Sequence, residues 1–135
     1  MQREFQIRTQ RKFETVDITA GVAEVASRCQ AEDAVCSVYV PHATAAVVVN
    51  ENADPNICTD LLDALDKLIP DGVWRHDRID GNGASHIQAA IVGPTEVIPI
   101  RDGDLHLSTW QNVFLCDFDG PRNTRRVIVT IFGDP

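Results

Sequence analysis

The chain has 135 residues, of which 44% are hydrophobic and 24% charged, and these values predict one globular domain over residues 1–135. The formal net charge of −8 argues against a nucleic-acid partner, because such binding depends on cationic contacts to phosphates. No apolar run reaches the roughly 20 residues of a membrane-spanning helix, and the first residues lack the apolar centre of a secretion signal. We therefore expect a cytoplasmic protein with neither a membrane nor a nucleic-acid partner.

The first half of the chain predicts strands and two helices. Residues 2–17 alternate enough to predict one or two strands, and apolar residues recur at helical spacing from Ile18 to Cys29. Residues 34–40 and 43–51 are expected to form two more strands, and the second of these is typical of a buried strand. Asp54-Pro55 predicts the start of the second helix, because aspartate can cap a helix and proline suits its first position.

The second half predicts mainly antiparallel strands. Residues 71–85 look irregular, and residues 86–92 fit either a short helix or a strand. Strands are then expected at 96–100, 105–107, 110–118 and 125–132, separated by short turns. Closely spaced hairpins combined with helices predict an α+β domain with mostly antiparallel, sandwich-like sheets and two main helices.

Three histidines lie beside small and polar residues. His42 precedes the apolar run at 43–49, and His76 and His86 bound a glycine-rich stretch. Neutral imidazole ligates zinc and related metals, and three such ligands plus water form a typical open catalytic site. The three histidines are therefore candidate metal ligands if the fold brings them together. The alternative is three separate surface or hydrogen-bonded histidines.

Carboxylates and amides lie close to the same segments. Helix capping alone explains Asp54, whereas Glu51 ends an apolar run that the core should enclose. Asp80 and Asn82 stand among glycines. They are explained either by a tight turn or by a loop that binds a divalent ion or moves a proton.

A third group of candidates lies near the C-terminal strands. Trp110 and Gln111 open a predicted strand, where tryptophan is more often part of the core than a ligand platform. Arg122 follows a predicted turn at Asp119-Gly120-Pro121. Its guanidinium suits a phosphate or a carboxylate, although an ordinary surface arginine is the favoured interpretation from the sequence alone.

Taken together, these motifs resemble the YjbQ-like family, often described as the secondary thiamine-phosphate synthase family. The matching segments follow one another over nearly the whole chain. They are His42-Ala43-Thr44-Ala45-Ala46, Asn50-Glu51-Asn52-Ala53-Asp54-Pro55, His76, Asp80-Gly81-Asn82 with His86, Pro99-Ile100, Gly103, Thr109-Trp110-Gln111 and Asp119-Gly120-Pro121-Arg122. The chain departs from the family pattern at Ser108, where glycine is more common.

The resemblance implies a homotrimer with a polar pocket near a subunit interface. It implies that His42, His76 and His86 are metal ligands, and that Glu51 and Asp80 are nearby acid/base or metal partners. The substrate-binding candidates are Thr44, Asn52, Asn82, Trp110, Gln111 and Arg122.

Three functions remain open at this point. The resemblance implies a synthase that joins hydroxymethylpyrimidine diphosphate to thiazole phosphate, with a divalent ion such as magnesium on the diphosphate and Arg122 on phosphate. The residues themselves suggest a hydrolase of a small substrate, in which a histidine-bound metal such as zinc activates water and Glu51 or Asp80 is the general base. The third function is a non-catalytic trimer that binds a metal or a small anion.

Overall fold

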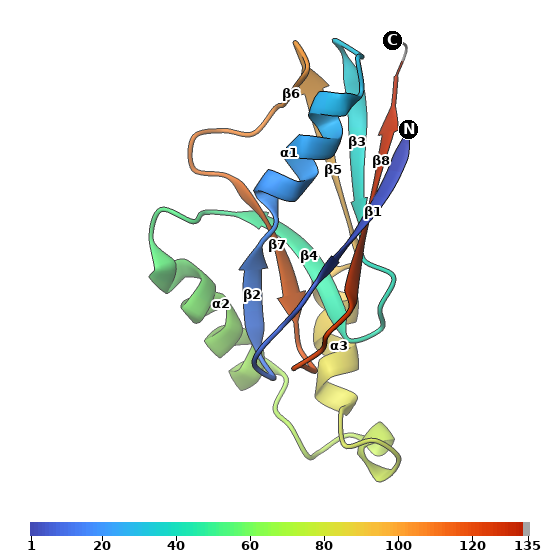
Figure 1. Cartoon of the computed structure of the whole chain (residues 1–135). Helices are drawn as coiled ribbons and strands as arrows, with labels where there is room; N and C mark the ends of the chain where they lie inside the picture. Colours follow the sequence, from blue (N-terminus) through green and yellow to red (C-terminus); the bar gives the residue numbers. More distant parts are fainter. Residues whose placement is uncertain (134–135) are drawn as a thin grey trace.

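The computed structural model describes residues 1–133 and arranges them in layers (Figure 1). Five strands form a larger antiparallel sheet in the order β1-β8-β3-β5-β6, and three form a smaller antiparallel sheet in the order β2-β7-β4. The strands are β1 (Gln2–Ile7), β2 (Glu14–Asp17), β3 (Ala34–Tyr39), β4 (Ala45–Asn50), β5 (Thr95–Arg101), β6 (Asp104–Leu105), β7 (Asn112–Asp117) and β8 (Arg125–Phe132). The helices are α1 (Thr19–Arg28), α2 (Pro55–Leu68) and α3 (Gly83–Val92), with a short 3-10 turn, η1 (Arg75–Arg78).

The main core lies between the two sheets and α1. Val38 and Val129 of the larger sheet, Val47 and Leu115 of the smaller sheet, and Val22 of α1 are all fully buried in one cluster. Each such side chain contributes about 1.5–3 kcal/mol through the removal of apolar surface from water. The same cluster fixes β4 and β8, the two strands that begin beside the candidate site.

A second core covers the other face of the smaller sheet with α2 and α3. Phe118 and Leu65 belong to this cluster. The buried side chain of Gln88 in α3 donates hydrogen bonds from Nε2 to the carbonyl oxygens of Leu65 and Ile69, at 3.3 Å and 3.2 Å. The Leu65 carbonyl also accepts from Ile69 N, whereas Ile69 follows the last residue of α2, where carbonyls lack helical partners. Gln88 thereby joins α3 to the end of α2.

The outer face of the larger sheet stays exposed in the single chain. We use the name outer sheet face for the exposed apolar side chains of Val35, Tyr39, Val97 and Phe132. Val35 lies opposite Phe132 in the register of β3 and β8, so these side chains form one surface. Exposed apolar patches of this kind on soluble proteins mark interaction sites.

The expected α+β class with antiparallel sheets is confirmed, and so is the Asp54 cap, whose Oδ1 accepts a hydrogen bond from Asn56 N at 2.9 Å. Three details were wrong. The strand expected at 105–107 is the two-residue β6, Asp104–Leu105. Residues 83–92 form a third helix, whose buried side is made of small and polar residues such as Ala84 and Gln88 and therefore lacks an apolar stripe. Strand β7 begins at Asn112 rather than at residue 110. Within residues 1–133, no helix combines the length and the apolar character needed to cross a membrane.

Candidate functional site

The candidate site residues lie at both ends of β4. His42 and Thr44 precede the strand, and Glu51 and Asn52 follow it. In Figure 1, β4 runs from the neighbourhood of α3 to the start of α2. A strand of six residues spans roughly 17–20 Å. Glu51 therefore lies at the opposite end of β4 from His42.

His76 and His86 meet where η1 and α3 come together. Their ring centroids are 4.6 Å apart with an interplanar angle of 79°, an edge-to-face contact. Both side chains line a hollow of about 490 Å³, which we call the histidine cleft. The other residues that line it are Val73, Trp74, Arg75, Gly83 and Ile87.

The Nε2 atom of His76 is a buried nitrogen without a hydrogen-bond partner among residues 1–133. Asp80 Oδ2 lies 3.6 Å from it, which is too long for a hydrogen bond. Burying a polar atom without a partner costs free energy, so such atoms in native proteins call for an explanation. A ligand held in the histidine cleft would supply one.

The carboxylate of Asp77 holds the two histidine-bearing elements together. Its Oδ1 accepts a hydrogen bond from Gly83 N at 2.8 Å, and its Oδ2 accepts one from Trp74 N at 3.1 Å. The hydrogen bond from Gly83, followed by that from Trp74, lowers the pKa of Asp77. Gly83 is also a steric requirement, because a Cβ there would lie 2.7 Å from Trp74 Cβ. We call these contacts the Asp77 clamp.

His42 and His86 line a second hollow of about 310 Å³ beside the first. The Nε2 atom of His42 accepts a hydrogen bond from the main-chain N–H of Arg126 at 2.8 Å. Burial, and then the positive charges of Arg125 and Arg126, lower the pKa of His42. His42 is therefore neutral at physiological pH.

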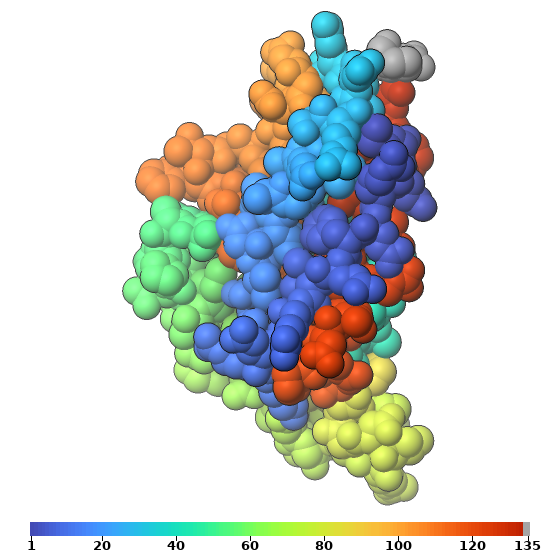
Figure 2. All heavy atoms as spheres, viewed as in Figure 1, coloured from blue at the N-terminus to red at the C-terminus, as the bar shows by residue number. Residues whose placement is uncertain are grey.

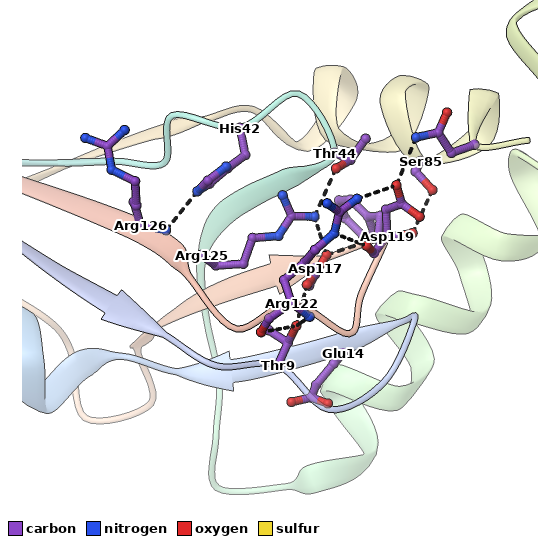
Figure 3. A network of polar contacts seen from close by, with 12 residues as sticks. Thr9, Glu14, His42, Thr44, Ser85, Asp117, Asp119, Arg122, Arg125 and Arg126 are labelled. Carbon is purple, nitrogen blue, oxygen red and sulfur yellow. Dashed lines mark hydrogen bonds and ion pairs between the residues drawn. The ribbon is translucent and has the colours of Figure 1, made fainter. Parts of the chain in front are cut away.

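A buried ion pair organises the chain around His42 (Figure 3). Arg125 Nη2 donates to Asp117 Oδ1 at 2.6 Å and to Thr44 Oγ1 at 2.9 Å, and Thr9 Oγ1 donates to Asp117 Oδ2 at 2.6 Å. The Asp117 and Arg125 side chains are 0% and 5% exposed. Burial raises the pKa of Asp117, but the hydrogen bonds from Arg125, Thr9 and Asp119 N together outweigh it and lower the pKa. We call Thr9, Thr44, Asp117 and Arg125 the buried network.

The turn after β7 connects this network to α3. Asp119 Oδ2 accepts hydrogen bonds from Asn82 Nδ2 at 2.9 Å and from Arg122 Nη2 at 3.1 Å. Gly120 is required here, since a Cβ at this position would overlap the carbonyl oxygen of Arg11. The turn therefore presents Arg122 on the surface with its charge already paired.

A family model described as UPF0047 protein YjbQ-like matches residues 3–134. The chain belongs to this YjbQ-like family. The resemblance noted in the sequence is thereby confirmed.

Relatives with the same description cover nearly the full length of this YjbQ-like chain. A UPF0047 protein of Methanocaldococcus jannaschii is 41% identical over 130 residues, which is 96% of this chain and 93% of that protein. The UPF0047 protein YugU of Bacillus subtilis is 35% identical over 136 residues, covering 98% of this chain and 100% of YugU. A solved protein of Sulfolobus solfataricus, described as YbjQ-like and of unknown function, superposes with a TM-score of 0.96 at 36% identity. The superposition covers 99% of this chain and 97% of that one.

The YjbQ-like chain divides the predicted metal ligands between two adjoining hollows. His86 lies in both hollows, His76 in one and His42 in the other. Asp80 lies beside His76, as its ion-pair distance shows. Among residues 1–133, no three His, Cys, Asp or Glu side chains form a group that could hold a metal ion. The histidines are neighbours, but one chain does not assemble them as a three-ligand cage.

Several predicted substrate-binding side chains make contacts within the YjbQ-like fold instead. Thr44 belongs to the buried network, and Asn82 and Arg122 bind Asp119. Asn52 Nδ2 donates to Asp17 Oδ2 at 2.7 Å, beyond the C-terminal end of β4. These side chains hold the loops in place.

Trp110 and Gln111 lie at a different end of the molecule. Trp110 is 61% exposed in a turn between β6 and β7, which contradicts its expected place in a strand. Gln111 lines a small hollow of about 210 Å³ with Glu96 and His106. Figure 2 shows this orange segment at the upper left, whereas the yellow-green segment around residues 75–82 projects at the lower end.

The sequence analysis missed the residues whose hydrogen bonds hold the segments of the YjbQ-like site in place. Asp77 had no signal beyond its place next to His76. A stronger signal existed for Asp117 and Arg125, since Asp117 interrupts the apolar run from Val113 to Phe118 and Arg125 opens a buried strand. Charged residues at core positions of strands are almost always paired.

Proposed function

We propose that this protein is a metal-dependent hydrolase of a small substrate, with its metal bound in the histidine cleft. The supporting observation is the Nε2 atom of His76, which is buried and unpartnered beside the ring of His86. A neutral imidazole that carries its proton on Nδ1 offers the lone pair of Nε2, and a metal ion bound there would give this buried nitrogen a partner.

The side chains available as ligands determine which metal ion fits and which catalytic role each residue would have. Two imidazoles with a nearby carboxylate suit zinc and related transition metals better than magnesium. A bound ion of this kind would polarise a water molecule at neutral pH. His76 and His86 would hold the ion, Asp80 would accept the proton of the attacking water, and the Asp77 clamp would fix the distance between the two imidazoles.

We also propose that the protein works as a homotrimer in which neighbouring copies cover the outer sheet face. Two observations support this. The outer sheet face is apolar and exposed, with Val97 62% and Phe132 60% exposed. In addition, Glu51 lies at the opposite end of β4 from His42, and the segment of Trp110 lies at a different end of the molecule from residues 75–82. A neighbouring copy would bring such residues to the same bound molecule.

The second candidate is the thiamine-phosphate synthase reaction. The observation that favours it is Arg75, which lines the histidine cleft together with the indole of Trp74. A guanidinium suits a phosphate, and an indole suits a planar heterocycle. Incubation with both phosphorylated substrates and magnesium or zinc, followed by measurement of thiamine phosphate, separates this candidate from a hydrolase. Product formation that Arg75→Gln abolishes would favour the synthase.

The metal is tested by zinc titration of wild type and single variants in a calorimeter. We expect His76→Ala and His86→Ala to weaken zinc binding at least about 100-fold, because even indirect partners of a metal site are worth about 10–100-fold. His106→Ala is the matched control, since His106 lines a different hollow, and its affinity should equal that of wild type. Chromogenic esters and phosphoesters should then be hydrolysed by zinc-loaded wild type and not by His86→Ala.

Two results would contradict the proposal. One is a wild-type protein that binds zinc no better than the double variant His76→Ala/His86→Ala. The other is an equal loss of zinc affinity in the His106→Ala control.

A further inference from the structure

The protonation pattern of His42 follows from one main-chain hydrogen bond. Arg126 N–H donates to His42 Nε2 at 2.8 Å, so the lone pair of this nitrogen is already occupied (Figure 3). A neutral imidazole carries its single proton on the nitrogen that does not accept. The proton of His42 therefore belongs on Nδ1.

This tautomer changes what His42 can do in the second hollow. A protonated Nδ1 has no lone pair for a metal ion, and Nε2 offers its lone pair to Arg126. His42 can only donate, through Nδ1–H. It lines the hollow that it shares with His86, so a molecule bound beside His86 would lie within reach of this donor.

The buried network keeps the Arg126 N–H in place. Arg125, the preceding residue, is anchored by Asp117 and Thr44, and the Arg126 side chain is paired with Glu4 of β1. The side chains on both sides of the Arg125–Arg126 peptide bond are thereby anchored at the start of β8. The tautomer of His42 is set by the backbone of a rigid strand rather than by a mobile side chain.

The charges around His42 indicate what the donor recognises. Arg122, Arg125 and Arg126 act on its ring, and Asp117 is the opposing charge. Each guanidinium is itself paired, with Asp119, Asp117 or Glu4, but three of the four charges that act on the ring are positive. An N–H donor in such surroundings favours an acceptor that carries negative charge.

We propose that His42 is a ligand-recognition residue, which donates a hydrogen bond from Nδ1–H to an anionic oxygen of the bound molecule and does not bind the metal. This inference rests on the proposed function and refines it, because it concerns the hollow that adjoins the histidine cleft through His86 and removes one of the three histidines from the ligand set. The metal would then be held by His76 and His86, with its other positions open to water, substrate or a neighbouring copy.

Nitrogen-15 NMR of the histidine side chains tests the tautomer in the full-length protein. In zinc-free protein, His42 should show a protonated Nδ1 and an unprotonated Nε2 near neutral pH. The pattern should be unchanged after zinc is added. Inorganic phosphate, the probe for an anionic oxygen, should shift the His42 Nδ1 signal saturably and leave the His106 signals unmoved. A proton on Nε2, or no response to phosphate, would overturn the inference.

Zinc titration of His42→Ala and His42→Gln separates this inference from the proposed function. The glutamine variant keeps an acceptor for Arg126 N and therefore guards against loss of the fold. We expect both variants to bind zinc within about threefold of wild type, in contrast to His86→Ala. A loss of tenfold or more in His42→Gln would make His42 a metal ligand and overturn the inference while the metal proposal stands. If wild type binds no zinc, the metal proposal fails, and the tautomer spectrum still decides the role of His42.

Discussion

Replacing Asp117 with alanine is expected to lower the free energy of unfolding by about 3–5 kcal/mol, the usual cost of removing one partner of a buried ion pair. The variant leaves the buried guanidinium of Arg125 without its carboxylate and the Thr9 hydroxyl without its acceptor. Urea unfolding followed by circular dichroism measures the loss. The unfolding midpoint should fall while the slope stays unchanged, because the folded state keeps its compactness.

A surface ion pair provides the control for this prediction. Glu24 and Arg28 form an exposed pair on α1 at 2.6 Å, and Glu24→Ala should cost less than about 1 kcal/mol. The double variant Asp117→Leu/Arg125→Met should recover much of the loss, since two apolar side chains need no partners. Equal losses for Asp117→Ala and Glu24→Ala would show that the buried network does not stabilise the fold.

The same carboxylate gives wild type a defined acid sensitivity. The pKa of Asp117 is lowered in the folded state, so its contribution is fully present above the unfolded-state value of about 3.9. It is lost as the pH falls through the lower, folded-state pKa. Asp117→Ala should therefore show a flatter decline of stability than wild type below about pH 4.

Phe132→Glu is expected to convert a trimeric wild type into monomers. The proposed assembly buries the outer sheet face, and a glutamate there would lose its hydration without gaining a cationic partner, at a cost of several kcal/mol per copy. Light scattering or analytical ultracentrifugation gives the mass of the assembly. Circular dichroism should show an unchanged fold, because Phe132 is already 60% exposed in the single chain.

Leu68→Glu is the matched control for this second prediction. Leu68 is 76% exposed on α2, away from the outer sheet face, so this variant should keep the wild-type mass. A wild type that is monomeric at tens of micromolar, or a Phe132→Glu variant that stays trimeric, would contradict the proposed assembly.

Local signals in the sequence were enough to predict much of the fold. Alternating and β-branched runs mark the strands, and Asp54-Pro55 marks the start of α2, because propensity and capping act over a few residues. Helix α3 was harder. Its buried face packs close to β4 through Ala84 and Ala89, and small residues give no clear periodic signal.

The site was predictable only in part, because its contacts join segments that are distant in sequence. The sequence singled out His76 and His86, and their contact depends on how η1 docks against α3. Nothing in the sequence indicated that Arg126 N–H would take one nitrogen of His42, since the two residues are 84 positions apart. Glu51 and His42 are separated by the length of β4, and this separation follows only once residues 45–50 are known to form one extended strand.

The Asp77 clamp also restricts how a substrate can bind. Helix N-termini commonly hold phosphate through free main-chain N–H groups and the positive end of the helix dipole. In this protein Asp77 already occupies the first N–H of α3 and brings a negative charge to that end. A phosphate or carboxylate would be repelled there. Any anion that the histidine cleft accepts must therefore be recognised by side chains, and Arg75 is the cationic one that lines it.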